Sequence, residues 1–150
     1  MKTQYGLLLL FSLCLAAVSC SKDEKDEPAP EASIEGSWDA VSEANQSGTI
    51  HYRQGAYADV GIKFTLNPDG TYTWITDNAN PNALPVTISG TYLYLPATHT
   101  LKLTGKSTVG PFGFNDNHVY TVIQLTATQL IVTEDTGIQG IGTSTFVFQR

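Results

Sequence analysis

The sequence predicts an all-β domain over residues 34–150, folded as an eight-stranded antiparallel up-and-down barrel, on three observations. Apolar and polar residues alternate with a period of two along short segments rich in Thr, Val, Ile, Tyr and Phe, as they do in β-strands. Gly, Pro and Asn interrupt these segments at short intervals, and helix signals are nearly absent. Long and short connections alternate strictly along the chain, which in an up-and-down sheet places all long loops at one end.

Eight segments carry the strand pattern, and turn-forming residues separate them. In chain order the predicted strands are about Gly36–Glu43, Asp59–Leu66, Thr71–Asp77, Val86–Leu95, Thr100–Thr104, His118–Thr126, Gln129–Glu134 and Thr143–Gln149. The clearest turn is at residues 67–70, where Pro68 sets φ and Gly70 permits the left-handed conformation of a tight hairpin.

The lengths of the connections predict the shape of the domain. Three are short, at residues 67–70, 96–99 and 127–128, and four are long, at residues 44–58, 78–85, 105–117 and 135–142. The short turns would close a floor and the long loops would surround a mouth. Eight strands enclose a space that holds side chains or one small ligand. An eight-stranded β-sandwich, with loop lengths that alternate by accident, is the alternative.

Strand alternation assigns side chains to the interior. Those expected near the floor are Trp38, Leu66, Tyr94 and Phe148. Those expected nearer the mouth are Ser42, Trp74, Ile88, Leu103 and Val132. Residues 118–126 are apolar on both faces, so the inward face of that strand stays open.

The interior and the rim are the candidate ligand site. Tyr52, Tyr57, Phe112 and Phe114 lie in long loops, where they would clamp a ligand, dock a partner, or fold back over the barrel end. Small barrels are commonly filled by their own side chains. Both a filled interior and a pocket for a small apolar or aromatic ligand therefore stay open.

Residues 1–33 differ in character from the domain. An apolar run from Leu7 to Val18 follows Lys2 and is too short to span a membrane, which is typical of an export signal. Cys20 follows Ala17, Val18 and Ser19, and this arrangement resembles the lipobox of bacterial lipoproteins. The resemblance implies that residues 1–19 are a signal peptide and that Cys20 carries a membrane-anchoring lipid. Residues 20–33 are rich in charge and proline, which predicts a disordered acidic tether.

The acidic residues directly after Cys20 resemble the lipoprotein export signal of Bacteroidetes. That resemblance implies an outer-membrane lipoprotein displayed on the cell surface. An inward-facing periplasmic position is the alternative.

Several pieces of the domain, in order, resemble the short lipocalin-like domains of Bacteroidetes lipoproteins. They are residues 34–38, 64–72, 89–92, 125–130 and 146–150. The first contains Gly36-Ser37-Trp38, which resembles the G-x-W motif of lipocalins. The resemblance implies a calycin-type barrel with Trp38 at its floor and Arg150 packed across the indole.

Charge and motif content argue against several functions. The whole chain has 8 Lys and Arg and 14 Asp and Glu; loss of Lys2 with residues 1–19 leaves 7 against 14, a net charge of −7. Such a chain without a basic patch is not expected to bind nucleic acid. His51, His99 and His118 lack metal-ligand spacing, and no catalytic motif is present. We expect no enzymatic activity, metal or cofactor.

Two functions follow from these expectations. The first is a membrane-anchored lipoprotein that binds a small apolar or aromatic ligand in its barrel. The alternative is a protein-interaction or inhibitor module, or an accessory subunit of an outer-membrane complex, acting through the rim loops. The sequence does not identify a protein partner.

Overall fold

The computed structural model describes residues 32–78, 84–107 and 115–150. Their regular structure is almost entirely β, apart from two 3₁₀ turns, η1 (Gly55–Tyr57) and η2 (Pro96–Thr98). The strands are β1 (Gly36–Asn45), β2 (Gly48–His51), β3 (Val60–Leu66), β4 (Thr71–Asn78), β5 (Val86–Leu95), β6 (Thr100–Ser107), β7 (Asn115–Leu125), β8 (Gln129–Asp135) and β9 (Thr143–Gln149). The predicted signal peptide, Cys20 and the tether up to residue 31 lie outside the described residues, as do Phe112 and Phe114.

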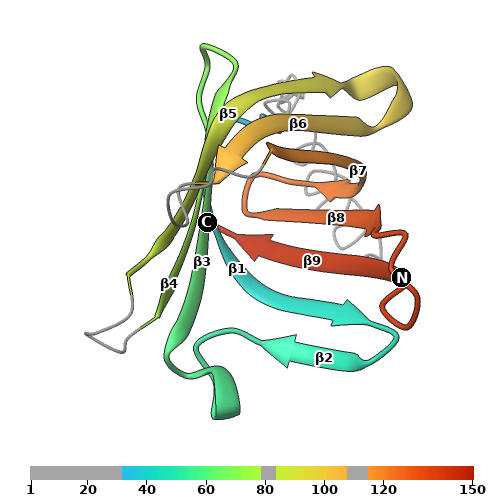
Figure 1. The fold of residues 1–150 in the computed structure, drawn as a ribbon. Helices are drawn as coiled ribbons and strands as arrows, with labels where there is room; N and C mark the ends of the chain where they lie inside the picture. Colours follow the sequence, from blue (N-terminus) through green and yellow to red (C-terminus); the bar gives the residue numbers. More distant parts are fainter. Residues whose placement is uncertain (1–31, 79–83, 108–114) are drawn as a thin grey trace, which may run out of the picture. The chain divides into compact units, whose positions relative to one another are not determined.

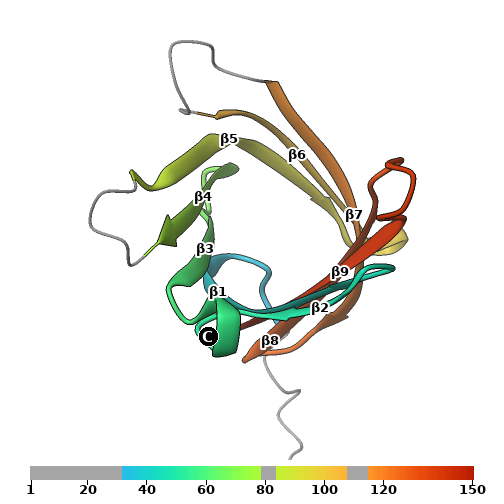
Figure 2. The ribbon, with the colours of Figure 1, turned by 60° about the horizontal axis from the view of Figure 1, so that its bottom comes forward.

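Eight strands close into an antiparallel barrel (Figures 1 and 2). From β3 to β9 each strand pairs with the next one in the chain, and β1 pairs with both β3 and β9. This closure confirms the predicted up-and-down barrel and excludes the sandwich. Backbone hydrogen bonds also tie the short turns to neighbouring strands, from Tyr92 N–H to Gly70 O (2.8 Å) and from Val122 N–H to His99 O (2.7 Å).

β2 was not among the predicted strands. It lies inside the connection predicted at residues 44–58 and forms a hairpin with the end of β1, from Ser42↔His51 to Asn45↔Gly48. Gly48 has φ of +135°, and the side chain of Asn45 accepts a hydrogen bond from Ser47 N–H (2.8 Å). The segment lacks large apolar residues apart from Ile50, so no period-two pattern marks it as a strand.

A bulge in β1 corrects the predicted orientation of Ser42. Ala40 pairs with Phe148, but the register then shifts, so that Ser42 pairs with Val147 and Glu43 pairs with Phe146. Directly opposed residues share a face of the sheet, and Phe146 and Phe148 both point inward. Glu43 therefore faces the interior, and Ser42 does not. An extra residue in one strand inverts the alternation beyond it.

The burial of side chains on β7 shows its inward face, which the sequence left open, and a second bulge follows in the same strand. Tyr120 and Val122 are buried, whereas Val119 is 58% exposed and Ile123 is 61% exposed. The register shifts between Val122 and Gln124, and Leu125 then pairs with the buried Leu130. Tyr120 and Val122 thus form the inward face of β7.

The floor half of the barrel is filled by its own side chains. Trp38, Leu66 and Phe148 are fully buried there, and Tyr94 is partly buried. Across β5 and β6, Gly90 lies opposite Gly105. A Cβ atom on Gly105 would collide with the hydroxyl of Tyr72 and lie 2.8 Å from Ser89 O. Gly105 therefore leaves the space that the phenol of Tyr72 occupies, and Gly90 allows close approach of the β6 backbone at Thr104.

Candidate functional site

An aromatic layer lies above the filled floor, formed by Trp74 on β4, Tyr120 on β7 and Phe146 on β9. The ring of Phe146 lies 5.8 Å from that of Trp74 at 90° and 6.2 Å from that of Tyr120 at 83°. Beneath this layer, Phe148 contacts Trp74 at 5.7 Å and Phe146 at 6.1 Å. Phe146 stacks on Phe148 at 21°, and the other three contacts are edge-to-face, which orients each ring against its neighbours.

Burial differs between the two halves of the interior. In the floor half Trp38, Leu66 and Phe148 are fully buried, whereas Tyr94 is partly buried. Trp74, Ile88 and Phe146 face the same interior but are only partly buried. Tyr120, Leu103 and Val132 beside them are buried, so solvent reaches only part of the mouth half of the interior. A ligand that enters there would meet an aromatic surface.

A polar belt, formed by Glu43, Tyr52, His118, Glu134 and Ser144, lies on the mouth side of the aromatic layer. Glu43 accepts hydrogen bonds from the Tyr52 hydroxyl (2.9 Å) and from the Ser144 hydroxyl (3.2 Å). Nδ1 of His118 lies 2.5 Å from Oε1 of Glu134. Ser144 and Glu134 are directly opposed in the β8–β9 ladder, so the belt runs continuously over β1, β9, β8 and β7.

The members of the polar belt hold one another in position. Burial, and then the hydrogen bond to Glu43, raises the pKa of Tyr52 well above its usual value, so the phenol stays a neutral donor. The ring of His118 stacks on Tyr120 at 5.6 Å and 18°, which joins the belt to the aromatic layer. Within the described part of the chain, no Lys or Arg forms an ion pair with Glu43 or Glu134.

This arrangement offers a ligand two kinds of contact. The aromatic layer supplies flat apolar faces, and the belt supplies carboxylate oxygens, which are acceptors for N–H or O–H groups and attract positive charge. Among the residues that the structure describes, no group of three or more His, Cys, Asp or Glu could hold a metal ion. None of the described helices has the length and apolarity needed to cross a membrane.

The residues predicted to line the mouth half take several positions. Trp74 and Ile88 face the mouth half of the interior and are partly buried, whereas Leu103 and Val132 beside them are buried. Tyr52 turns inward and joins the polar belt. Tyr57, in η1, instead lines a hollow of about 330 Å³ on the outer surface with Thr49, His51, Gln54, Gly55 and Ala56.

The sequence did not identify Glu43, Glu134 or Ser144 as interior residues. Glu134 has the same parity as Leu130 and Val132, and Ser144 has the same parity as Phe146 and Phe148, so strand alternation could have found both. Glu43 could not have been found in this way, because the bulge in β1 inverts the alternation before it.

The sequence was also compared with known proteins. No family model matches it, and no curated protein matches it.

Proposed function

We propose that this protein is a lipid-anchored binding protein whose barrel holds a small ligand with an aromatic or apolar body and a cationic or hydrogen-bond-donating head. The observation that carries the proposal is the pairing of the aromatic layer with the polar belt in the mouth half of the interior, which solvent reaches in part. The barrel with its buried aromatic cluster is compatible with ligand binding.

The charge of the polar belt supports a cationic head. Glu43 is held by two neutral hydroxyls, and within the described residues no cationic side chain pairs with it. A partly buried carboxylate is stabilised by a nearby positive charge. A ligand amine would supply that charge, while its ring lies against Trp74 and Phe146.

The anchor in this proposal comes from the N-terminal sequence. Lipid on Cys20, followed by an acidic tether, would hold the barrel at the outer membrane, displayed on the cell surface. Stable anchoring takes more than one acyl chain, because a single chain binds only marginally and reversibly. Ligand capture near the membrane is then the task of the barrel.

Fluorescence of the two tryptophans tests the binding site directly. The Trp38→Phe variant leaves Trp74 as the sole tryptophan, so its emission reports on the upper interior. We would titrate it with three probes that share a naphthalene ring and differ in charge: naphthylmethylamine is cationic, methylnaphthalene is neutral and naphthoate is anionic. The proposal requires saturable changes in Trp74 emission, with the amine binding most tightly and the carboxylate most weakly.

A charge-neutral variant shows whether the polar belt causes that preference. Glu43→Gln should reduce amine affinity about tenfold or more, the scale of one charge-assisted hydrogen bond, and leave methylnaphthalene binding unchanged. Asp39→Asn is the matched control, because Asp39 lies on the same strand but is exposed on the outer face. Equal affinity for all three probes, or tightest binding of the carboxylate, would contradict a cation-selective site.

A second candidate is protein docking at the rim. Leu84 and Ile138 are large apolar side chains, and both are exposed in long connections at the mouth end. Native mass spectrometry of protein purified from its own membranes separates the two functions. A retained small mass supports the binder, whereas an apo mass with a co-purifying protein supports docking.

A further inference from the structure

The wall between β1 and β3 is incomplete towards the mouth. β1 pairs with β3 only from Gly36↔Leu66 to Asp39↔Lys63, and beyond the bulge it pairs with β2 instead. Residues 60–62 of β3 pair with β4 on one side, but the β1 ladder does not reach them. This leaves a seam in the barrel wall that no β-ladder crosses; one backbone bond, from Arg53 N–H to Val60 O (3.1 Å), joins the β2–η1 connection to β3 at its mouth end.

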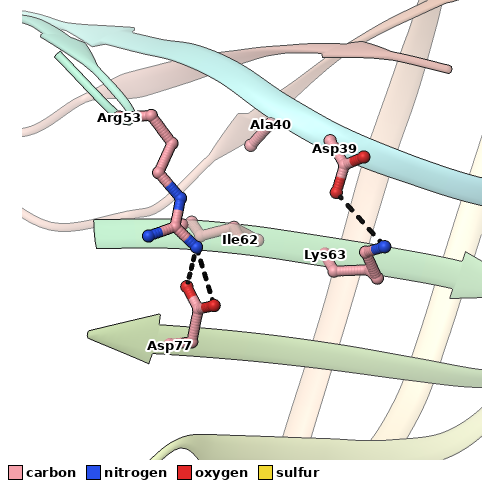
Figure 3. Close-up of a pocket in the computed structure, with 7 residues that line it drawn as sticks. Asp39, Ala40, Arg53, Ile62, Lys63 and Asp77 are labelled. Atoms are coloured by element: carbon pink, nitrogen blue, oxygen red, sulfur yellow. Dashed lines mark hydrogen bonds and ion pairs between the residues drawn. The ribbon is translucent and has the colours of Figure 1, made fainter. Parts of the chain in front are cut away.

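A hollow of about 140 Å³ occupies the seam (Figure 3). It is lined by Asp39, Ala40, Arg53, Gly61, Ile62, Lys63 and Asp77. Ala40 and Ile62 belong to the hydrophobic core, and each is only 8% exposed. At the seam, therefore, a single layer of side chains separates the outer surface from the barrel interior.

One ion pair crosses the seam on its outer side. The guanidinium of Arg53 donates to both carboxylate oxygens of Asp77 on β4, each at 2.7 Å. To reach Asp77 it passes over Gly61, where a Cβ atom would lie 2.6 Å from its Cζ. Glycine at position 61 is thus what allows the arginine to lie across β3, as Figure 3 shows.

The backbone of Arg53 is held in a conformation unusual for a non-glycine residue. Its φ is +59°, and its N–H is shared between Tyr57 O (3.0 Å) and Val60 O (3.1 Å). Such a conformation costs energy and persists only where the surroundings enforce it. The connection from β2 to β3 therefore presents Arg53 to Asp77 in a defined position.

From these observations we infer that the Arg53–Asp77 pair is a latch on a lateral opening of the barrel. When the pair breaks, Arg53 and η1 move away from β3 and the bond from Arg53 N–H to Val60 O is lost, while β2 and the buried Tyr52 stay paired with β1; the seam then widens beside Ala40 and Ile62. The opening gives a small ligand a side entrance to the upper interior, a role that rests on the proposed function. The latch itself does not depend on a ligand.

The strength of the pair suits a latch rather than a permanent bond. Its side chains are 51% and 50% exposed, so water and salt screen their attraction. Loss of an exposed ion pair changes an equilibrium by up to about fivefold. We expect opening at the seam to become more frequent by that factor, and to be promoted by salt.

Hydrogen exchange measured by mass spectrometry on the full chain tests the latch without any ligand. Arg53→Gln and Asp77→Asn should each speed exchange in peptides that cover residues 60–64 by about threefold to fivefold. The double variant should add little to either single change, because both remove the same pair. Raising the salt concentration should speed exchange in the wild type and have less effect in the variants.

Lys63→Gln is the matched control. Lys63 lines the same hollow and pairs with Asp39 at 3.7 Å, but it lies at the last rung of the β1–β3 ladder and does not cross the seam. We expect exchange in this variant to match the wild type. Unchanged exchange in Arg53→Gln, or an equal increase in peptides from β5 and β6, would overturn the latch.

Binding kinetics separate the latch from the proposed function. If naphthylmethylamine binds, Arg53→Gln should raise its association and dissociation rates together and leave its Kd unchanged. Faster hydrogen exchange at residues 60–64 in Arg53→Gln, with no binding of the probe, would support the latch and contradict the proposed function. Probe binding with rates identical to wild type would contradict the side entrance.

Discussion

The guanidinium of Arg150 lies over the indole of Trp38, with Cζ 3.8 Å from the ring centroid. The same guanidinium donates to the carbonyl oxygens of Ser33 (2.9 Å) and Glu35, and the indole N–H donates to Ile34 O (2.9 Å). One contact thus joins the end of β9 to the start of β1 and to the residues before it. This contact between Arg150 and Trp38 closes the floor of the barrel, where the first and last strands of the domain meet.

Replacement of Trp38 or Arg150 tests how much this contact contributes to stability. Trp38→Ala should lower the free energy of unfolding by about 3–5 kcal/mol, because a fully buried aromatic side chain leaves a cavity. Arg150→Ala should cost about 0.5–2 kcal/mol, the range of a cation–π contact. Urea denaturation of both variants measures the difference. A Trp38→Ala variant as stable as the wild type would place the indole outside the core.

The glycine at position 105 gives a prediction about space in the core. Gly105→Ala should destabilise the fold by about 1–3 kcal/mol, because its Cβ would meet both Tyr72 and the backbone at Ser89 O. Combining it with Tyr72→Phe should recover part of that loss, since the colliding hydroxyl is removed and the Ser89 contact is not. Thermal denaturation of the two single variants and the double variant gives the coupling. Strictly additive losses would contradict it.

The raised pKa of Tyr52 predicts that the folded protein loses stability at alkaline pH. Its pKa in the folded protein is raised, chiefly by burial and then by the bond to Glu43, above the value of 10.0 of a free phenol. The protonated phenol therefore adds its full contribution to the free energy of unfolding at pH values below 10.0. That contribution is lost as the pH rises above this value towards the pKa of the folded protein. Between pH 8 and pH 11 the wild type should therefore lose more stability than Tyr52→Phe does. Urea unfolding at the two pH values measures this; parallel losses would contradict it.

Cys20 predicts the cellular position of the protein. In the proposed lipoprotein, Cys20→Ser should move the chain from the membrane fraction to the soluble fraction, because no lipid can be attached. Fractionation of cells that express either form, followed by immunoblotting, measures the change. Membrane association equal to that of the wild type would contradict the lipid anchor.

Features encoded by neighbouring residues could be read from the sequence. The Asn67–Gly70 turn, for example, forms as expected, and Gly70 has φ of +81°. The hydroxyl of Thr71 and then its N–H donate to Asp69, and these bonds lower the pKa of Asp69. Strand alternation likewise placed Trp74 and Val132 inside. These features depend on side chains within a few positions of each other, so the pattern predicts them without knowledge of the rest of the chain.

The candidate site was harder to predict, because its key acid lies beyond a bulge. Glu43 and Ser144 are 101 positions apart and meet only because β1 pairs with β9. The predicted strand at residues 118–126 was apolar on both faces, and only the folded barrel decided that Tyr120 and Val122 are inside. Long-range pairing therefore decided where the polar groups gather.

The sequence by itself determined the all-β class, the order of the eight barrel strands and the separation of short turns from long connections. These follow from a period of two and from turn residues, which act locally. The tertiary structure decided closure of the barrel, the bulges in β1 and β7, the hairpin of β2 and the seam that Arg53 crosses. Closure and the bulge in β1 depend on the pairing of β1 with β9, which lie at opposite ends of the domain sequence. The β2 hairpin and the β7 bulge join neighbouring strands, but no period-two pattern marks them.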